Sequence, residues 1–195
     1  MKRVLVFCGP SGVGKSTILK RLFEIYPDDY SYSVSHTTRP PRKGEIHGKH
    51  YHFVEKEEME KAIANKDFVE TTQYSGNLYG TSKESIINAT GEGKICILEL
   101  DLKGAKSFKE NKEFDVVFVF VTPPNHDTLK ERLQKRKSET EEQIQNRLEI
   151  AMTEIEFVEK NPTFFDYILE NTVVDESVNE LDSFTSSFFF VKPNE

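Results

Sequence analysis

The segment that most constrains the fold is the glycine-rich run Gly9-Pro10-Ser11-Gly12-Val13-Gly14-Lys15-Ser16. It matches the pattern G-x-x-x-x-G-K-[ST], in which backbone N–H groups surround a phosphate. A short β-branched apolar run at 4–8 precedes it, and an amphipathic helical pattern at 16–26 follows it. Because the motif requires this strand–loop–helix order, the sequence predicts that a nucleoside triphosphate binds here.

Each part of this loop has a role when phosphate is bound. Glycine allows positive φ, so the N–H groups turn inward, and the following helix N-terminus adds partial positive charge. Lys15 reaches the β- and γ-phosphates, and the Ser16 hydroxyl is the predicted protein ligand of Mg²⁺. The alternative is a plain glycine turn with a solvated lysine. The predicted nucleotide-binding residues of this segment are Gly9, Pro10, Ser11, Gly12, Val13, Gly14, Lys15, Ser16 and Thr17.

The class of nucleotide-binding protein follows from what accompanies the loop. A GTPase switch would carry a guanine-reading N-K-x-D segment late in the chain, and the asparagines at 146, 161, 171 and 179 do not begin one. A motor would be longer than 195 residues. A small-molecule kinase needs a second site facing the γ-phosphate, so the rest of the chain must supply it.

The remaining apolar runs alternate between strand and helix patterns. Further strands are predicted at 95–100, 116–121 and 167–169, and helices at 103–110, 125–136, 141–159 and 177–190. Strands alternating with helices indicate an α/β domain with a parallel sheet flanked by helices. At about 150 residues per domain, a chain of 195 residues is one domain, with room for an insertion.

Residues 36–90 interrupt this alternation and predict the insertion. A half-exposed strand pattern lies at 51–54, a short helix at 57–66 and a turn at 75–77. Arg39 and Arg42 lie three apart in a proline-stiffened segment that suits forked hydrogen bonding to phosphate. A solvated basic loop is the alternative for these two arginines alone.

Composition excludes several function classes. The chain has 26 basic and 33 acidic residues, a net charge of −7, which argues against a nucleic-acid binder. Its apolar runs are too short for a transmembrane helix, and no signal peptide is evident. Cys8 and Cys96 both lie in strand-like runs, so a disulfide framework is not expected and a reducing, cytoplasmic setting is.

Five motifs together resemble the guanylate kinases in order and spacing. They lie at 11–16, 33–42, 48–54, 79–81 and 98–101, and the similarity covers about residues 3–175. The resemblance implies a P-loop NTPase core at 1–34, 91–124 and 146–195. It also implies an inserted, mixed α/β GMP-binding subdomain at 35–90 and a helical lid at 125–145.

The resemblance further implies the reaction ATP + GMP ⇌ ADP + GDP with Mg²⁺, in guanine nucleotide salvage and recycling. Its partners are then ATP and GMP, with dGMP as an alternative acceptor, and no nucleic acid or membrane. A monomer is expected.

The same resemblance assigns residues to each substrate. The GMP phosphate is assigned to Arg39, Arg42, Tyr51 and Tyr79, and guanine to Ser35, Glu70, Thr81 and Asp101. This suits the base, since a carboxylate accepts from guanine N1–H and N2–H₂ while hydroxyls donate to O6. Asn171 is assigned to the adenine side. The residues expected to stabilise the transferring phosphoryl group are Lys15, Arg39, Arg132, Arg136 and Arg147.

Some positions depart from the family pattern, and other functions remain open. Glu99 replaces a commoner Asp, residues 135–137 lack the usual glycines, and His36 is expected to be an exposed loop histidine. The alternatives are a kinase of another nucleoside monophosphate, a non-catalytic phosphopeptide-binding scaffold, and a kinase of an unrelated metabolite. The intact Gly14-Lys15-Ser16 and the short chain favour an enzyme over a scaffold.

Overall fold

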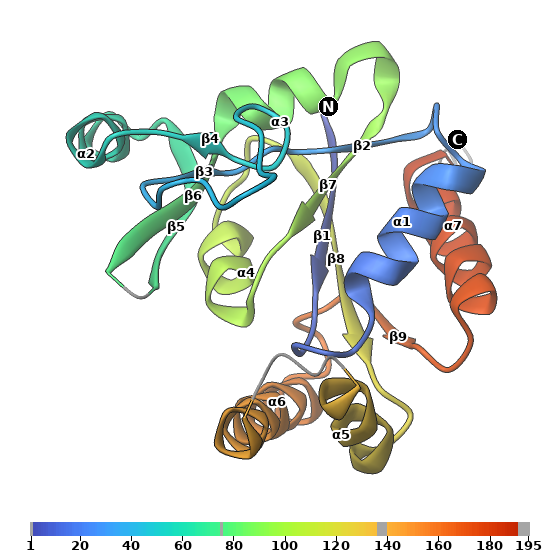
Figure 1. Cartoon of the computed structure of the whole chain (residues 1–195). Helices are drawn as coiled ribbons and strands as arrows, with labels where there is room; N and C mark the ends of the chain where they lie inside the picture. The colour runs from blue at the N-terminus through green and yellow to red at the C-terminus, as the bar shows by residue number, and fades with distance from the viewer. Residues whose placement is uncertain (1, 75, 136–139, 191–195) are drawn as a thin grey trace. The chain divides into compact units, whose positions relative to one another are not determined.

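The computed structural model describes residues 2–74, 76–135 and 140–190. Its elements alternate much as the apolar runs predict (Figure 1). In chain order they are β1 (Arg3–Cys8), α1 (Lys15–Ile25), β2 (Tyr30–Tyr32), β3 (His36–Thr37), β4 (His52–Phe53), α2 (Lys56–Ala64), β5 (Phe68–Tyr74), β6 (Asn77–Ser82), α3 (Lys83–Ala89), the 3₁₀ turn η1 (Gly91–Gly93), β7 (Ile95–Glu99), α4 (Leu102–Lys109), β8 (Asp115–Thr122), α5 (His126–Gln134), α6 (Glu141–Lys160), β9 (Tyr167–Glu170) and α7 (Val174–Phe190).

The larger sheet has five strands in the order β2-β7-β1-β8-β9. β2 pairs with β7 in parallel, and β8 pairs with β9 in parallel. Strand β1, at the centre, is buried from Val4 to Cys8, as a strand covered on both faces must be. The predicted α/β class with a parallel sheet flanked by helices is confirmed.

The chain forms two compact units. The first unit comprises Met1–Val4, Asp28–Leu98 and Lys103–Asp115, and the second comprises Leu5–Pro27, Glu99–Leu102 and Val116–Glu195. The predicted division into core, GMP-binding insert and lid is defined by ligands and not by compactness. It therefore stays a prediction.

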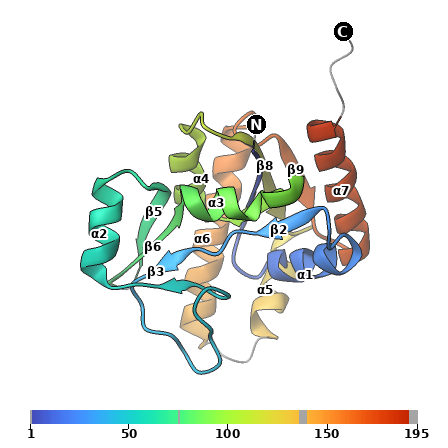
Figure 2. The same ribbon diagram turned by 90° about the horizontal axis from the view of Figure 1, so that it is seen from above.

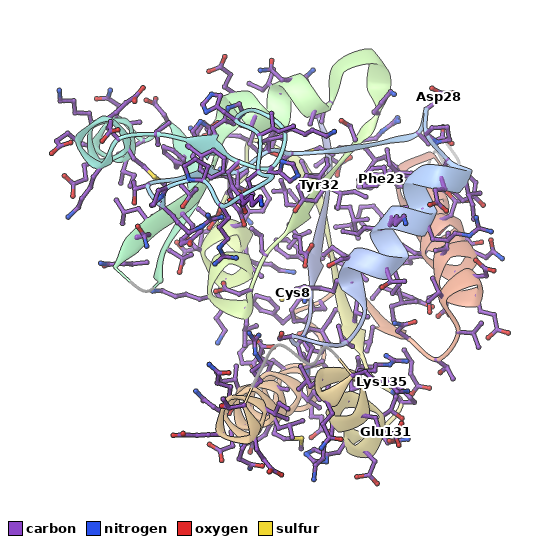
Figure 3. The ribbon with its side chains drawn as sticks, in the orientation of Figure 1. Cys8, Phe23, Asp28, Tyr32, Glu131 and Lys135 are labelled. Carbon is purple, nitrogen blue, oxygen red and sulfur yellow. The ribbon has the colours of Figure 1, made fainter. Side chains whose placement is uncertain are left out.

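In the second unit, helices α1 and α7 pack side by side (Figure 2). Helix α1 contributes the buried Ile18 and Leu22, which lie four apart on one face, and α7 contributes Val178 and Leu181. Cys8, at the end of β1, is fully buried in the same unit (Figure 3). Burial of these apolar side chains fixes the loop that follows β1 on a rigid support.

The first unit contains a second sheet, in the order β4-β3-β6-β5. Strands β5 and β6 form an antiparallel hairpin with a register shift between Phe68 and Glu70. Gly80 is required there, because an added Cβ would lie 2.8 Å from Phe68 Cδ1 and 2.9 Å from the Glu70 carbonyl oxygen. Helix α3 packs against β6, and α2 packs against β5.

Two sequence expectations are changed by the structure. The prediction that His36 is an exposed loop residue is wrong. His36 lies in β3, is half-buried, and stacks on His52 with ring centroids 4.6 Å apart. The predicted elements also lack the seven-residue helix α3 and the strands β2, β5 and β6. Across the described residues, no helix is both long enough and apolar enough to span a membrane.

Candidate nucleotide and phosphate sites

The loop between β1 and α1 has the geometry that its glycines predict. Gly14 caps α1 with φ of 105°, and Gly9 has φ of 147°. A Cβ on Gly14 would lie 2.4 Å from Asn171 Nδ2, and one on Gly9 would lie 2.4 Å from the Val121 carbonyl oxygen. Both positions therefore exclude any side chain for reasons of conformation and of space.

The Lys15 side chain contacts the backbone of this loop. Its Nζ donates to the carbonyl oxygens of Gly9 and Pro10 at 2.6 and 3.2 Å, and lies 3.9 Å from Glu99 Oε1. Ser16 and Thr17 are exposed in the first turn of α1. A cation and a helix N-terminus thus occur together, as phosphate binding requires.

Two arginines from later in the chain reach the loop. Arg132 on α5 donates from Nη1 to the Val13 carbonyl oxygen at 3.0 Å and from Nη2 to that of Asn171 at 2.9 Å. Arg147 on α6 donates from Nη1 to Ser11 Oγ at 2.7 Å. Of the three arginines expected from this part of the chain, Arg132 and Arg147 contact the phosphate loop, and Arg136 lies outside the described residues.

Asn171 also supports this loop through a side-chain hydrogen bond. Its Nδ2 donates to the Val13 carbonyl oxygen at 2.8 Å, and its Oδ1 accepts from Ser177 Oγ at 3.2 Å. The residue is 2% exposed, so its amide is already committed to protein partners. It holds the loop backbone, and its assignment to adenine stays a prediction.

A carboxylate that sequence reasoning missed lies near Lys15. Burial raises the pKa of the Glu154 carboxyl, the Lys15 charge lowers it, and the Asp101 charge raises it. Burial and then the Glu154 charge raise the pKa of the Cys8 thiol to about 12, so this cysteine is inert. The available signal was spacing: Glu154 follows Arg147 by seven residues, two turns along α6.

Magnesium fits this site through the nucleotide. Among the residues that the structure describes, no group of three or more His, Cys, Asp or Glu side chains could hold an ion alone. Mg²⁺ characteristically takes most of its ligands from phosphate oxygens and water, with one or two from protein. The exposed Ser16 hydroxyl is available as such a ligand, and Glu99 lies close to Lys15.

The first unit brings together three of the four predicted guanine-contacting residues. Thr81 Oγ1 donates to Glu70 Oε1 at 2.8 Å, and Ser35 Oγ lies 3.2 Å from Thr81 Oγ1. Glu70 is 6% exposed and Thr81 fully buried. A nearly buried carboxylate in a chain of hydroxyls is an arrangement that accepts N–H groups from a ligand.

Asp101, the fourth predicted guanine contact, belongs to the second unit, just after β7. Its contribution to the base stays a prediction.

The predicted acceptor-phosphate residues surround Arg39. Its guanidinium carbon lies 5.5 Å from the Tyr51 ring centroid, and the Tyr51 and Tyr79 ring centroids are 6.1 Å apart. Arg42 is exposed. An arginine, two tyrosines and a second arginine therefore occur in one small region, which suits a phosphate.

Sequence reasoning missed Glu45, which forms an ion pair with the Arg39 guanidinium. Arg39 Nη1 and Nη2 donate to its two carboxylate oxygens at 2.8 and 2.9 Å, and the Arg42 N–H donates to it at 2.6 Å. These bonds lower the pKa of Glu45 to about 2. The only advance signal was an acidic residue six positions after Arg39, in a segment otherwise basic.

Together, a phosphate loop following the central strand of a parallel sheet and a separate polar face carrying a paired arginine define a P-loop nucleotide-binding α/β protein. The family model for guanylate kinase matches residues 1–188. The chain is 43% identical to guanylate kinase of Sus scrofa over 175 residues, covering 90% of this chain and 87% of that one. It is 42% identical to the Homo sapiens enzyme over 179 residues, covering 92% and 90%. The chain therefore belongs to the guanylate kinase family.

Two further comparisons define the extent of the match. The chain is 42% identical to guanylate kinase 1 of Oryza sativa over 185 residues, 95% of this chain but 48% of that protein, so it spans about half the length of that relative. The crystal structure of guanylate kinase from Anaplasma phagocytophilum superposes with a TM-score of 0.71 at 28% identity, covering 97% of this chain and 87% of that one.

Proposed function

We propose that this chain transfers the γ-phosphoryl group of Mg²⁺–ATP to GMP, giving ADP and GDP reversibly. Family membership supports the reaction class. The observation that carries the choice of acceptor is the nearly buried Glu70, which accepts from Thr81 and is linked through Thr81 to Ser35. Arg39 follows β3 of the same sheet.

The hydrogen-bond chain divides the work of base recognition. A hydroxyl carries one proton, and Thr81 gives its proton to Glu70. Thr81 therefore orients the carboxylate and accepts from Ser35 Oγ, and the Ser35 hydroxyl turns from Thr81 to donate to O6 when guanine binds. Glu70 accepts from guanine N1–H and N2–H₂, whereas adenine presents a donor in place of O6.

Charge neutralisation supplies the catalysis. A phosphate acceptor is already ionised at neutral pH, so no general base is needed, and the obstacle is the approach of two anions. Lys15 and Arg147, both beside the loop, offset charge on the donor, and Arg39 holds the acceptor phosphate. Each Arg132 Nη carries a second N–H beyond those given to Val13 and Asn171. When bound, Mg²⁺ supplies further positive charge at the phosphates, with Ser16 as its protein ligand.

The predicted setting completes the proposal. We place the reaction in the cytosol with ATP and GMP as the partners, dGMP as an alternative acceptor, and the chain as a monomer. Cys8 and Cys96 are both free and buried, which is compatible with a reducing compartment.

The test is a coupled assay of ADP formation with GMP, dGMP, AMP, UMP and dTMP as acceptors. We expect turnover with GMP, weaker turnover with dGMP, and little with the other three. Preference for AMP or dTMP would overturn the acceptor assignment. Absence of turnover with every acceptor, combined with tight binding of a phosphopeptide, would favour the scaffold alternative.

A further inference from the structure

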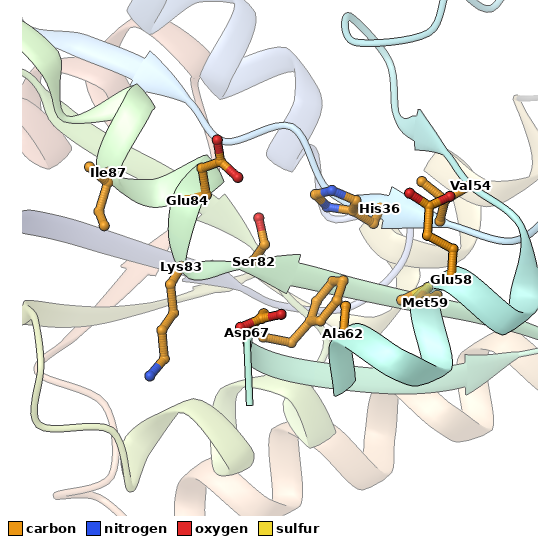
Figure 4. Close-up of a pocket in the computed structure, with 11 residues that line it drawn as sticks. His36, Val54, Glu58, Met59, Ala62, Asp67, Ser82, Lys83, Glu84 and Ile87 are labelled. Carbon is orange, nitrogen blue, oxygen red and sulfur yellow. The ribbon is translucent and has the colours of Figure 1, made fainter. Parts of the chain in front are cut away.

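A cavity of about 390 Å³ lies in the first unit, away from the residues assigned above (Figure 4). His36 and Ser82 line it, whereas their chain neighbours Ser35 and Thr81 belong to the guanine-contacting chain. Because successive residues of a strand point to opposite faces, the cavity opens on the other face of the β4-β3-β6-β5 sheet. Helices α2 and α3, together with Val54, Asp67 and Phe68, supply the remaining walls.

The floor of this cavity is apolar. Met59 on α2 is 1% exposed, and Phe68 and Ala62 line the cavity beside it. Ile87 on α3 also lines it and is 47% exposed. An apolar group entering the cavity would be removed from water together with the exposed parts of Phe68, Ala62 and Ile87, which is the usual source of affinity in small-molecule sites.

The rim is acidic. Glu58, Asp67 and Glu84 all line the cavity and are exposed. Lys83, the one lysine or arginine among the described residues that line it, pairs through Nζ with Glu113 and extends away from His36 in Figure 4. The field at the cavity is therefore negative and favours a cation.

His36, which lines the cavity, has a buried ring nitrogen without a hydrogen-bond partner among the described residues. His36 Nδ1 is buried and, within the described part of the chain, makes no hydrogen bond. Burial and the neighbouring His52 and His47 lower the pKa of His36 to about 4, so its ring is neutral near pH 7. A neutral imidazole nitrogen can accept an N–H, and a buried acceptor left unsatisfied is costly.

We propose that this cavity is a second ligand site, specific for a small organic cation that joins an apolar body to a protonated amine. The apolar body packs on Met59 and Phe68. The amine lies toward the acidic rim and donates to His36 Nδ1 once a small rotation of the imidazole ring exposes this buried atom. This site goes beyond the phosphoryl transfer proposed above and does not depend on it.

Three probes of one shape test the proposal on the full chain: 2-phenylethylammonium, neutral 2-phenylethanol and anionic 3-phenylpropionate. Each is titrated at pH 7.5 while amide resonances of α2, α3 and β6 are followed by NMR. For a ligand this small we expect a dissociation constant on the order of 1 mM for the cation. The cation should bind at least tenfold more tightly than the alcohol, and the anion should not bind. Equal affinity for all three would overturn the proposal.

Matched variants locate the bound probe. The triple variant Glu58→Gln, Asp67→Asn, Glu84→Gln changes only exposed groups, and should weaken cation binding about tenfold while leaving alcohol binding unchanged. Glu57→Gln, on α2 but outside the cavity, is the control and should bind like wild type. His36→Phe keeps an aromatic ring against His52 and should also weaken the cation several-fold. Loss of binding in Glu70→Gln with retention in the triple variant would place the probe on the guanine face and overturn the proposal.

Discussion

The phosphate loop and the proposed guanine-contacting face, with Ser35, Glu70 and Thr81, hold their charged groups in different ways. The loop is contiguous, and Lys15 donates to the backbone carbonyls of Gly9 and Pro10, which carry only partial charge, while the Glu99 carboxylate lies farther away, at 3.9 Å. On the other face Arg39 is held by the full charge of Glu45 through two hydrogen bonds. A cation held by carbonyls is available to any phosphate, whereas one held by a carboxylate is fixed in direction before its ligand arrives.

The two regions also differ in how they are assembled. The Val13 carbonyl oxygen of the loop accepts hydrogen bonds from both Arg132 and Asn171. Residues distant in the sequence thus support a geometry that the local sequence already specifies. Glu70 and Thr81 instead become neighbours only through strand pairing. The phosphate loop is therefore formed by consecutive residues, whereas the proposed guanine-contacting face is formed by residues that only folding brings together. Mutations should affect the two sites independently.

The largest effect is expected at the loop, from Lys15→Met. Loss of this cation should lower kcat by about 10³-fold or more, because the lost charge acts where the transition state is most anionic. GMP affinity and the unfolding midpoint should stay within error of wild type, since the contacts of Glu70 are untouched. Lys20→Met, an exposed lysine on the same helix, is the control in steady-state kinetics and chemical denaturation. Near-normal turnover would remove the phosphate-loop assignment.

Glu70→Gln is the matching change on the guanine face. The amide presents a donor to a guanine donor in a nearly buried position, a mismatch costing about 1–3 kcal/mol, or roughly 5- to 150-fold in kcat/KM for GMP. ATP affinity should be unchanged, and discrimination against AMP should shrink. Glu57→Gln is the exposed control. If GMP kinetics stay within about twofold of wild type, Glu70 does not contact the base.

The phosphate loop could be predicted from sequence more directly than the proposed guanine-contacting face. The loop could be predicted from eight consecutive residues, because positive φ at Gly9 and Gly14 is a local requirement that sequence displays directly. The guanine face came only from family resemblance. Its three contacts depend on strand register and on the irregularity between Phe68 and Glu70, which no periodicity reports.

The missed residues have related physical causes. Strand β3 has two residues, too few for an alternating pattern, so His36 was misplaced as a loop residue. Glu45 becomes meaningful only when the chain turns back on Arg39. Burial, which raises the pKa of Glu154, depends on how α6 packs and not on its composition.

Glu45→Gln tests whether a fixed arginine matters. The amide can accept from only one side of the Arg39 fork, and its own N–H₂ faces the guanidinium donors, so Arg39 loses its set direction. We expect KM for GMP to rise roughly tenfold, since hydrogen bonds to charged groups are worth about 1.5–3 kcal/mol, while ATP affinity stays constant.

Guanosine binding gives this test a separate readout. Guanosine has the base but no phosphate, so Glu45→Gln should leave its affinity unchanged, whereas Glu70→Gln should weaken it. Calorimetric titration of guanosine and GMP into both variants distinguishes the two roles. A Glu45→Gln variant that binds GMP more tightly than wild type would show that Glu45 competes with the phosphate instead of preparing its site.

The smallest expected effect is a loss of folding stability on acidification that arises from His36, in the first unit. Folding lowers the pKa of His36 from 6.5 to about 4, so between these values the unfolded chain binds a proton that the folded chain excludes. The stability present above pH 6.5 is therefore lost progressively as the pH falls toward 4. Near the loop the sign is opposite: the raised pKa of Glu154 means that protonation on acidification favours the folded state.

His36→Phe should flatten the pH dependence of the denaturation midpoint between pH 6.5 and 4 relative to wild type. The exposed His126→Gln, on α5, should follow the wild-type curve. Equal slopes for wild type and His36→Phe would mean that the ring of His36 is hydrated, and would also remove the unsatisfied acceptor on which the second ligand site partly depends.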